Sequence, residues 1–313
     1  MRRNLAASVF ALSMIPLAAS AGPPLSHYAI FAATDRVKIG AGSHVAFLPG
    51  APTPIVGTGY KGTINPGVFL NGGALIQGDV RSASDVSLAN GCAITGTVYH
   101  PAGTTVSLGS GSTTAGQLIG NPELPVLPAA SPCASGGTNH TIANGQSLTL
   151  APGSYGSIQL GGACHLSLSS GAYYLTKLTS GNGLRLNVDL SGGPLSVYVC
   201  GVSGEGYTDF GSVTTSIVAG PSDPNTASQM IKFEPQGASA TGWSFEASGS
   251  SKWLGTVFSP NGSIHFGGGG CCSSWTGQFL AQGQVNLEHA VTGSLPTEIS
   301  RIATWGRVKS MYR

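Results

Sequence analysis

Apolar residues alternate with small polar residues in short stretches that recur along the chain. Leucine positions return at a fixed short interval in the segment 148–190, where Leu148, Leu166 and Leu184 align and Leu160 aligns with Leu178. An alternating stretch this short is typical of a strand with one buried face. Because one such strand cannot bury its face alone, a fixed short period indicates coils stacked on copies of themselves. We predict an all-β fold, a single-stranded right-handed parallel β-helix with about 18–22 residues per turn and three faces.

The same pattern fills most of the remaining chain. Val68, Val86 and Val106 align at nearly equal steps, the second slightly longer than the first, and the segment 253–269 is repeated at 275–289. A proline-rich stretch separates two blocks of turns, and proline cannot occupy a central strand. The predicted divisions are a signal peptide (1–21), N-terminal turns (22–120), a proline-rich connector (121–146), central and C-terminal turns (147–298) and a basic tail or short C-terminal cap (299–313).

The segment 1–21 predicts export. Arg2 and Arg3 precede a short apolar run, and Ala19-Ser20-Ala21 provides a small-x-small cleavage site. We expect a secreted, periplasmic or cell-surface protein after cleavage near Ala21. The run is too short to span a bilayer, and the rest of the sequence predicts no membrane span.

Charge excludes one class of partner. The chain has 14 Lys and Arg against 12 Asp and Glu, and loss of Arg2 and Arg3 would leave 12 against 12. A mature chain without net positive charge gives no electrostatic reason to bind nucleic acid.

Six cysteines in an exported chain predict disulfides, although the sequence does not select among the pairings. Cys164 and Cys200 are separated by two of the leucine intervals, which puts them two coils apart unless the period breaks after Leu190. The candidates are Cys92, Cys133, Cys164, Cys200, Cys271 and Cys272.

Several segments carry a resemblance: LTLAPGSYGSIQL (148–160), LSLSSGAYYL (166–175), VDLSGGPLSVYV (188–199), GTVFSPNGSIHFGG (255–268) and TGQFLAQGQVNL (276–287). They resemble a β-helical domain of uncharacterised function in exported bacterial proteins, which is similar in its repeats to the polymer-forming bactofilins. The closing part also resembles the last coils of ice-binding-type β-helices. The resemblance implies an exported, non-catalytic surface or matrix protein. It does not imply ice binding, because the threonine pairs lack a constant phase.

Catalytic and metal-binding signals are sparse. No P-loop, G-x-S-x-G or H-E-x-x-H motif is present. The best acidic candidates are Glu205 and Asp209, with Asp189, and a surface loop is the favoured interpretation. A metal site built from His265, Cys271, Cys272 and His289 is disfavoured because vicinal cysteines do not match the usual ligand spacing. We therefore predict no catalytic residue, no metal and no cofactor.

These observations favour a structural or adhesive exported rod that acts by rigid display and surface binding. Its expected partners are surface glycans or matrix components, or further copies joined end to end. One alternative is a polysaccharide lyase or glycoside hydrolase on the same scaffold, and another is a glycan-binding module. A sugar-stacking surface could be supplied by Trp243, Trp253 and Trp275, with Tyr60, Tyr99 and Tyr207. Equivalent repeat positions favour a structural stack for Trp253 and Trp275.

Overall fold

The computed structural model describes residues 22–48, 51–201, 204–268, 272–289 and 291–295. Nearly all of its regular structure is strand, and every strand pairing is parallel. The exceptions are a 3-10 turn (η1, Leu25–His27) and one short helix (α1, Pro224–Gln229). Within these residues no helix has the length and apolar character needed to cross a bilayer. The predicted signal peptide and the cap over 299–313 lie outside the described residues.

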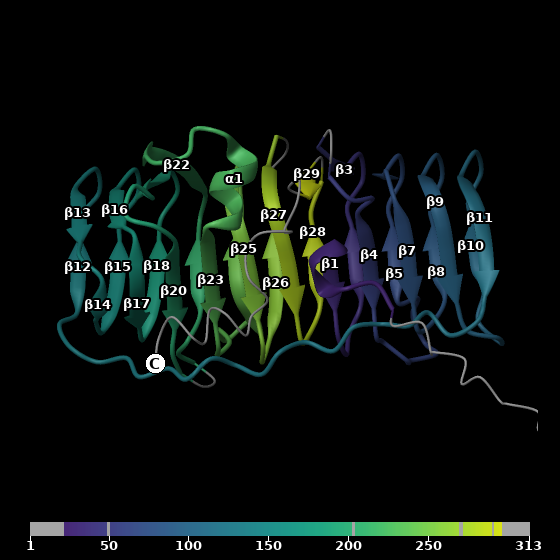
Figure 1. Ribbon diagram of the computed structural model, residues 1–313, viewed down its shortest axis with the longest axis horizontal. Helices are drawn as coiled ribbons and strands as arrows, with labels where there is room; N and C mark the ends of the chain where they lie inside the picture. The colour runs from purple at the N-terminus through teal and green to yellow at the C-terminus, as the bar shows by residue number, and fades with distance from the viewer. Residues whose placement is uncertain (1–21, 49–50, 202–203, 269–271, 290, 296–313) are drawn as a thin grey trace, which may run out of the picture.

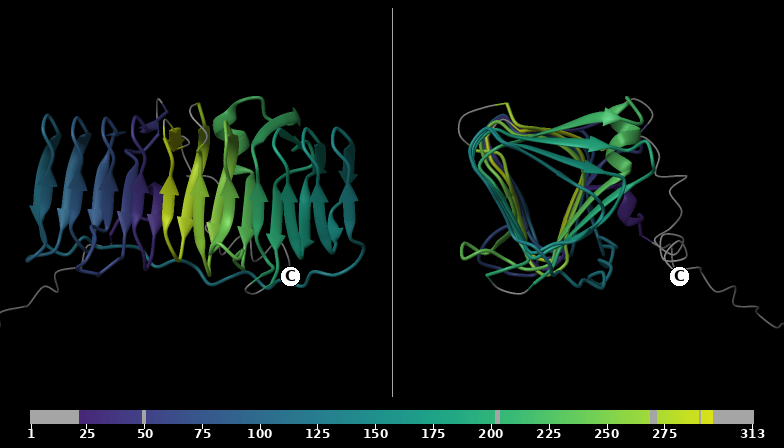
Figure 2. Two further views of the ribbon diagram at one scale, coloured as in Figure 1. Left: turned by 180° about the vertical axis from the view of Figure 1, so that it is seen from behind. Right: turned by 90° about the vertical axis from the view of Figure 1, so that its left-hand side faces the viewer.

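The strands form two parallel sheets that enclose a triangular tube (Figure 2, right). Sheet B has 11 strands and forms one wall. Its strands are β2 (Val37–Ile39), β5 (Val68–Leu70), β8 (Val86–Leu88), β10 (Val106–Leu108), β12 (His140–Ile142), β15 (Ser157–Leu160), β18 (Lys177–Ser180), β21 (Thr208–Phe210), β24 (Trp243–Ala247), β26 (Ser263–Phe266) and β28 (Val285–Leu287).

Sheet A has 18 strands and forms the other two walls. Its strands are β1 (Tyr28–Ala32), β3 (His44–Phe47), β4 (Ile55–Thr58), β6 (Leu75–Ile76), β7 (Asp79–Ser82), β9 (Ala93–His100), β11 (Thr113–Ile119), β13 (Ser147–Leu150), β14 (Gly153–Ser154), β16 (His165–Ser169), β17 (Gly171–Leu175), β19 (Leu184–Asp189), β20 (Leu195–Val199), β22 (Val213–Ala219), β23 (Ile231–Pro235), β25 (Lys252–Ser259), β27 (Ser274–Ala281) and β29 (Thr292–Leu295).

The core is built from stacked columns of inward-facing side chains. Val68, Val86 and Val106 pair across β5, β8 and β10, as the sequence predicts. The turn after each strand contains a glycine with a positive φ, 72° at Gly73 and 71° at Gly91, a conformation that other residues rarely adopt. The alternation of apolar residues and the glycines in the turns therefore both favour the same coiled path of the backbone.

One predicted alignment is wrong by two residues. Leu148 pairs with Leu166 as expected, but Leu166 pairs with Leu186, and Leu184 pairs with Val213. The register changes at the corner between β16 and β17, which is longer than the preceding corner, so Gly153 pairs with Tyr173. A solenoid accommodates inserted residues at its corners because they leave the stacked strands in place. Leu160 likewise pairs with Ser180 and not with Leu178.

The order of coils along the rod does not follow the sequence. The first coil lies between the last coil and the second, since β1 pairs with both β27 and β4, and β2 pairs with both β28 and β5. We call this junction the seam. The ends of the rod are consequently internal segments of the chain, β10 and β11 at one end and β12 and β13 at the other (Figure 1).

The proline-rich segment connects these two ends. Residues 120–139 contain no strand and run along the side of the rod from β11 to β12 (Figure 1). An extended chain of about 20 residues reaches roughly 66 Å. Eleven strands at about 4.8 Å spacing cover roughly 48 Å. The connector is therefore long enough to return along the whole rod.

Contacts along its length hold the connector to both blocks of coils. Near its start, Arg81 Nη1 donates to Pro122 O at 2.7 Å. Leu124 and Leu127 then pack on an apolar patch over the seam. The patch is formed by Tyr28, Phe31, Ile55, Phe258 and Leu280.

A buried polar clamp and a disulfide hold the second half of the connector. Glu234 on β23 is fully buried and accepts from Ser131 N at 2.6 Å and from Ser131 Oγ at 2.8 Å. It also forms an ion pair with Lys232. Two residues beyond Ser131, Cys133 forms a disulfide with Cys200 at the end of β20. This pair is one of those that the sequence left open.

The other cysteines have different environments. Cys92 and Cys164 are unoxidised and buried, so the Cys164–Cys200 pair is not formed. Their thiols donate to carbonyls of the adjacent coil, Cys92 to Asn71 O at 2.9 Å and Cys164 to Ala143 O at 3.1 Å. Cys272 is disulfide-bonded, and Cys271 lies outside the described residues.

Candidate functional site

A row of polar side chains crosses the outer surface of sheet B at one register position. Asp209 pairs with Glu246, Glu246 with His265, His265 with Asn286, and Asn286 with Lys38. We call these five residues the sheet B row. Each is the residue between two buried inward-facing positions of its strand, as Asp209 is between Thr208 and Phe210. Strand alternation therefore directs all five side chains outward.

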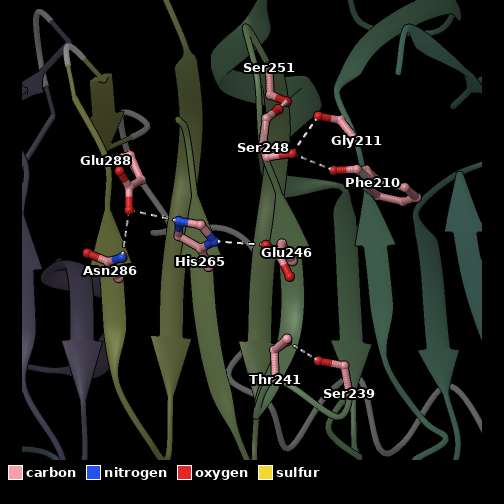
Figure 3. Close-up of polar contacts among 10 residues, drawn as sticks. All are labelled: Phe210, Gly211, Ser239, Thr241, Glu246, Ser248, Ser251, His265, Asn286 and Glu288. Carbon is pink, nitrogen blue, oxygen red and sulfur yellow. Dashed lines mark hydrogen bonds and ion pairs between the residues drawn. The ribbon is translucent and has the colours of Figure 1, made fainter. Parts of the chain in front are cut away.

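His265 joins two carboxylates within this row. Its Nδ1 lies 3.1 Å from Glu246 Oε1 and its Nε2 lies 3.2 Å from Glu288 Oε1 (Figure 3). Glu288 directly follows β28. A neutral imidazole can donate to only one of these acceptors, whereas the imidazolium donates to both. The ring therefore fixes the positions of two carboxylates on either side of β26.

Asn286 contributes the row's buried amide. Its Nδ2 donates to Glu288 Oε1 at 3.2 Å, and the side chain is 7% exposed. Its Oδ1 is buried, and no described residue donates a hydrogen bond to it. A buried carbonyl without a donor costs free energy that a bound donor would recover.

Asp209 has a perturbed acidity. Burial, followed by the nearby Glu246 carboxylate, raises the pKa of Asp209, and the Lys177 ammonium partly offsets the increase. Lys177 also lies over the Tyr207 ring, 4.8 Å from its centroid. Asp209 is thus more readily protonated than an ordinary aspartate.

An aromatic ring borders the row. Trp243, at the start of β24, stacks on His265 with ring centroids 5.1 Å apart and an interplanar angle of 29°. By contrast, Trp253 and Trp275 are register partners, 1% and 2% exposed, inside the core. Their predicted structural role is confirmed, and Trp243 alone of the three is placed beside surface polar groups.

The three acidic candidates from the sequence do not form one site. Glu205 is exposed in the turn before β21, whereas Asp189 ends β19 in sheet A. Asp189 Oδ1 accepts from Ser191 N at 2.8 Å and Ser191 Oγ at 2.6 Å, and these bonds lower the pKa of Asp189. Asp189 is therefore a turn-stabilising residue. The partner of Asp209 is Glu246, which the sequence did not single out.

The structure gives no support to the disfavoured metal site. Both ring nitrogens of His265 face carboxylates, and Cys272 is in a disulfide. Among the residues that the structure describes, no three His, Cys, Asp or Glu side chains are grouped so as to hold a metal ion.

The sequence does contain a signal for the row. Its members occupy the middle positions of TDF, FEA, IHF, VNL and VKI, triplets within five strands, each with apolar or small inward flanks. They recur at irregular intervals, since the step from Asp209 to Glu246 is nearly twice the step from Glu246 to His265. A search at a fixed period therefore misses them.

Comparison with known proteins gives no match to a protein-family model, to a curated protein or to a solved structure.

Proposed function

We propose that this chain is an exported structural or adhesive rod of the cell surface, matrix or an appendage, which acts by rigid display and surface binding and not by catalysis. The observation that carries the proposal is the closed construction of the tube. Two blocks of coils meet in parallel at the seam, and one connector is fastened along both. Hydrogen bonds between coils and a continuous apolar interior make such a stack stiff along its axis.

The handedness and the turn length of the tube are part of the same proposal. We take the tube to be a right-handed single-stranded β-helix with about 18–22 residues in its regular turns, because parallel strand crossovers are right-handed in nearly all proteins. The register steps from Leu148 to Leu166 and from Leu166 to Leu186 both fall in this range and support the regular turn length.

Export is supported by the covalent chemistry. The Cys133–Cys200 disulfide is of the kind that persists in oxidising compartments. Together with the predicted cleavage near Ala21, it favours a secreted, periplasmic or surface location.

Expression of the full chain in a bacterial host, followed by fractionation and mass spectrometry, tests this proposal. We expect an exported product that begins near Gly22, contains the Cys133–Cys200 bond and has the small-angle scattering profile of a rod. A reduced cytoplasmic product or a compact scattering profile would contradict it.

The expected partners are surface glycans or matrix components, or further copies joined end to end. The ends support the second option, because β10 and β11 leave apolar side chains uncovered: Leu108 is 46%, Leu118 52% and Ile119 68% exposed. At the seam, separate segments of the same chain already join through parallel pairing of this kind.

Glycoside hydrolysis is a second candidate function, favoured by the pairing of Asp209 with Glu246. Their strands are about 4.8 Å apart, near the roughly 5 Å that separates the carboxyl groups of retaining glycosidases. A raised pKa on Asp209 suits a general acid, and Glu246, whose Oε1 lies 3.1 Å from His265 Nδ1, would be the nucleophile.

Incubation with a panel of polysaccharides separates the two candidates. Turnover that is lost in both Asp209→Asn and Glu246→Gln but retained in Glu205→Gln would replace the structural proposal. Absence of reducing-end release from every polysaccharide would support it.

A further inference from the structure

From Asp209 to Asn286, the hydrogen-bonding capacity left open on the sheet B row is almost entirely that of acceptors. Both nitrogens of His265 and one of the two hydrogens of Asn286 Nδ2 are already used. Glu246 and Glu288 each keep a second carboxylate oxygen, and the described residues donate no hydrogen bond to Asp209. A ligand that complements the row from Asp209 to Asn286 must therefore donate hydrogen bonds.

Asn286 independently points to a bound donor. It is more than nine-tenths buried in the row, and its Oδ1 accepts from no described residue. Its Oδ1 lies on the side of Asn286 away from His265, toward β2 (Figure 3), and a hydroxyl or ammonium group reaching that side would satisfy it. This unpaired acceptor is distinct from the carboxylates, because it would attract a donor even without a charge.

The shape and border of the row favour an extended ring-bearing ligand. From Asp209 to Asn286 it crosses three strand spacings, about 14 Å, so a chain running along the rod axis would contact each residue in turn. Trp243 beside His265 offers an aromatic surface for the apolar face of a sugar ring. Lys38 ends the acceptor segment with a positive charge, which would repel a cationic ligand from extending further.

We propose that the segment from Asp209 to Asn286, with Glu288 and Trp243, binds an amino-bearing glycan, whose ammonium and hydroxyl groups donate to the carboxylates and to Asn286. This inference rests on the proposed surface-binding function and names its ligand class. Several carboxylates on neighbouring strands favour protonated amino groups over neutral or acidic sugars. A lysine-rich peptide shares the charge but lacks the sugar ring that Trp243 would contact.

Calorimetric titration of the mature protein with glucosamine hexamers, near pH 5.5, tests the proposal. We expect saturable binding that weakens with salt and falls at least tenfold with N-acetylglucosamine hexamers, which have the same ring but no ammonium. Equal affinity for the acetylated hexamer or for a hexalysine peptide would overturn the proposal, as would absence of binding.

Matched variants locate the site. The double variant Asp209→Asn/Glu246→Gln removes two carboxylate charges from the row and should weaken glucosamine hexamer binding at least tenfold. Glu205→Gln/Asp189→Asn removes two carboxylate charges elsewhere and should change the affinity less than twofold. Equal effects of the two double variants would mean nonspecific charge attraction and overturn the assigned site.

Asn286→Leu separates binding from folding. Leucine has a similar size and removes an unpaired buried carbonyl, so the melting temperature should not fall by more than a few degrees. Affinity for the hexamer should nevertheless fall severalfold. Unchanged affinity in a folded Asn286→Leu variant would refute the role of this side chain.

Failure of this inference is distinguishable from failure of the proposed function. An exported rod that binds no amino glycan would refute the ligand assignment alone. A chain that is retained inside the cell would refute the proposed function, whatever it binds in a calorimeter.

Discussion

At the scale of single residues, the two reduced cysteines line corners of the tube, where each thiol donates to a carbonyl of the adjacent coil. Cys92 lies directly before β9 and Ser112 directly before β11, so they are adjacent in one inward column. Ser112 Oγ donates to Ala89 O at 2.6 Å, and Cys92 Sγ donates to Asn71 O at 2.9 Å. The thiol therefore occupies a position that a hydroxyl also fills.

Replacement of these thiols by hydroxyls should be tolerated. We expect Cys92→Ser and Cys164→Ser each to change the free energy of unfolding by no more than about 1 kcal/mol, because each hydroxyl can keep the carbonyl bond. Urea unfolding measures this change. Cys92→Leu is the contrasting variant, since its larger side chain must overpack the corner, and equal loss in Ser and Leu variants would contradict this account.

Two aspartates should give opposite pH dependences of stability. The raised pKa of Asp209 means that its contribution to stability is present below its ordinary value of 3.8 and is lost as the pH rises through its folded-state pKa. The difference in unfolding free energy between Asp209→Asn and the parent protein should therefore favour the variant more at pH 7 than at pH 3. The lowered pKa of Asp189 makes a contribution that is present above 3.8 and lost as the pH falls through its folded-state pKa.

Asp189→Asn should accordingly destabilise the protein at pH 7 and should do so less at about pH 3. Urea unfolding of both variants at the two pH values measures the difference. The same sign for both variants at pH 7 would show that their environments are not as described.

At the scale of elements, the connector is the segment whose attachment the sequence predicts least. Its prolines exclude it from a central strand and therefore predict an extended connector. Its partners do not follow, because Ser131, Cys133, Glu234 and Cys200 are brought together by the stacking of coils. Distant pairs of this kind have no local sequence pattern.

Loss of the polar clamp at Glu234 should lower the stability of the protein. Glu234→Leu breaks the buried ion pair with Lys232 and removes both bonds to Ser131, so we expect a loss of about 3–5 kcal/mol in the free energy of unfolding. The double variant Lys232→Met/Glu234→Leu should recover part of this loss.

Limited proteolysis provides a second measure of the clamp. Cleavage of the connector between residues 125 and 135 should be faster in Glu234→Leu than in the parent protein. An unchanged unfolding free energy together with unchanged proteolysis would mean that the clamp does not hold the connector.

Sequence patterns also predict the walls better than the site. Inward valines and leucines mark each wall because burial demands them on every coil, as at Val68 and Val86. Outward positions carry no such constraint, so Glu246 and His265 are visible only once the strands are aligned. Corner insertions such as the one before β17 shift the alignment, which is why a fixed period places Leu184 in the wrong column.

At the scale of the whole molecule, the rod has two open ends with different side chains. Exposed apolar side chains of β10 and β11 (Leu108, Leu118 and Ile119) lie at one end. At the opposite end is His140 on β12, whose ring centroid lies 5.9 Å from that of Tyr155. Unpaired edge strands with apolar side chains favour association with another chain.

Charges placed on the open end should therefore prevent association. We expect the parent protein to form larger species with increasing concentration in sedimentation velocity experiments, and Leu118→Asp/Ile119→Lys to remain monomeric. Val218 is also exposed, 62%, but lies along the side of the rod, so Val218→Asp is the matched control. Monomers at every concentration of the parent protein would contradict end-to-end association.

The seam, at which the first coil docks on the last, determines the order of the coils along the rod. The most direct measurement is a pair of distances between spin labels at exposed sites, in the Cys92→Ser/Cys164→Ser background. Labels at His44 and Thr292, which are register partners across the seam, should be close together. Labels at Thr113 and Ser147, at opposite ends of the rod, should be separated by roughly 48 Å, ten strand spacings. A long distance for the first pair and a short one for the second would show that the coils follow sequence order and would contradict the account.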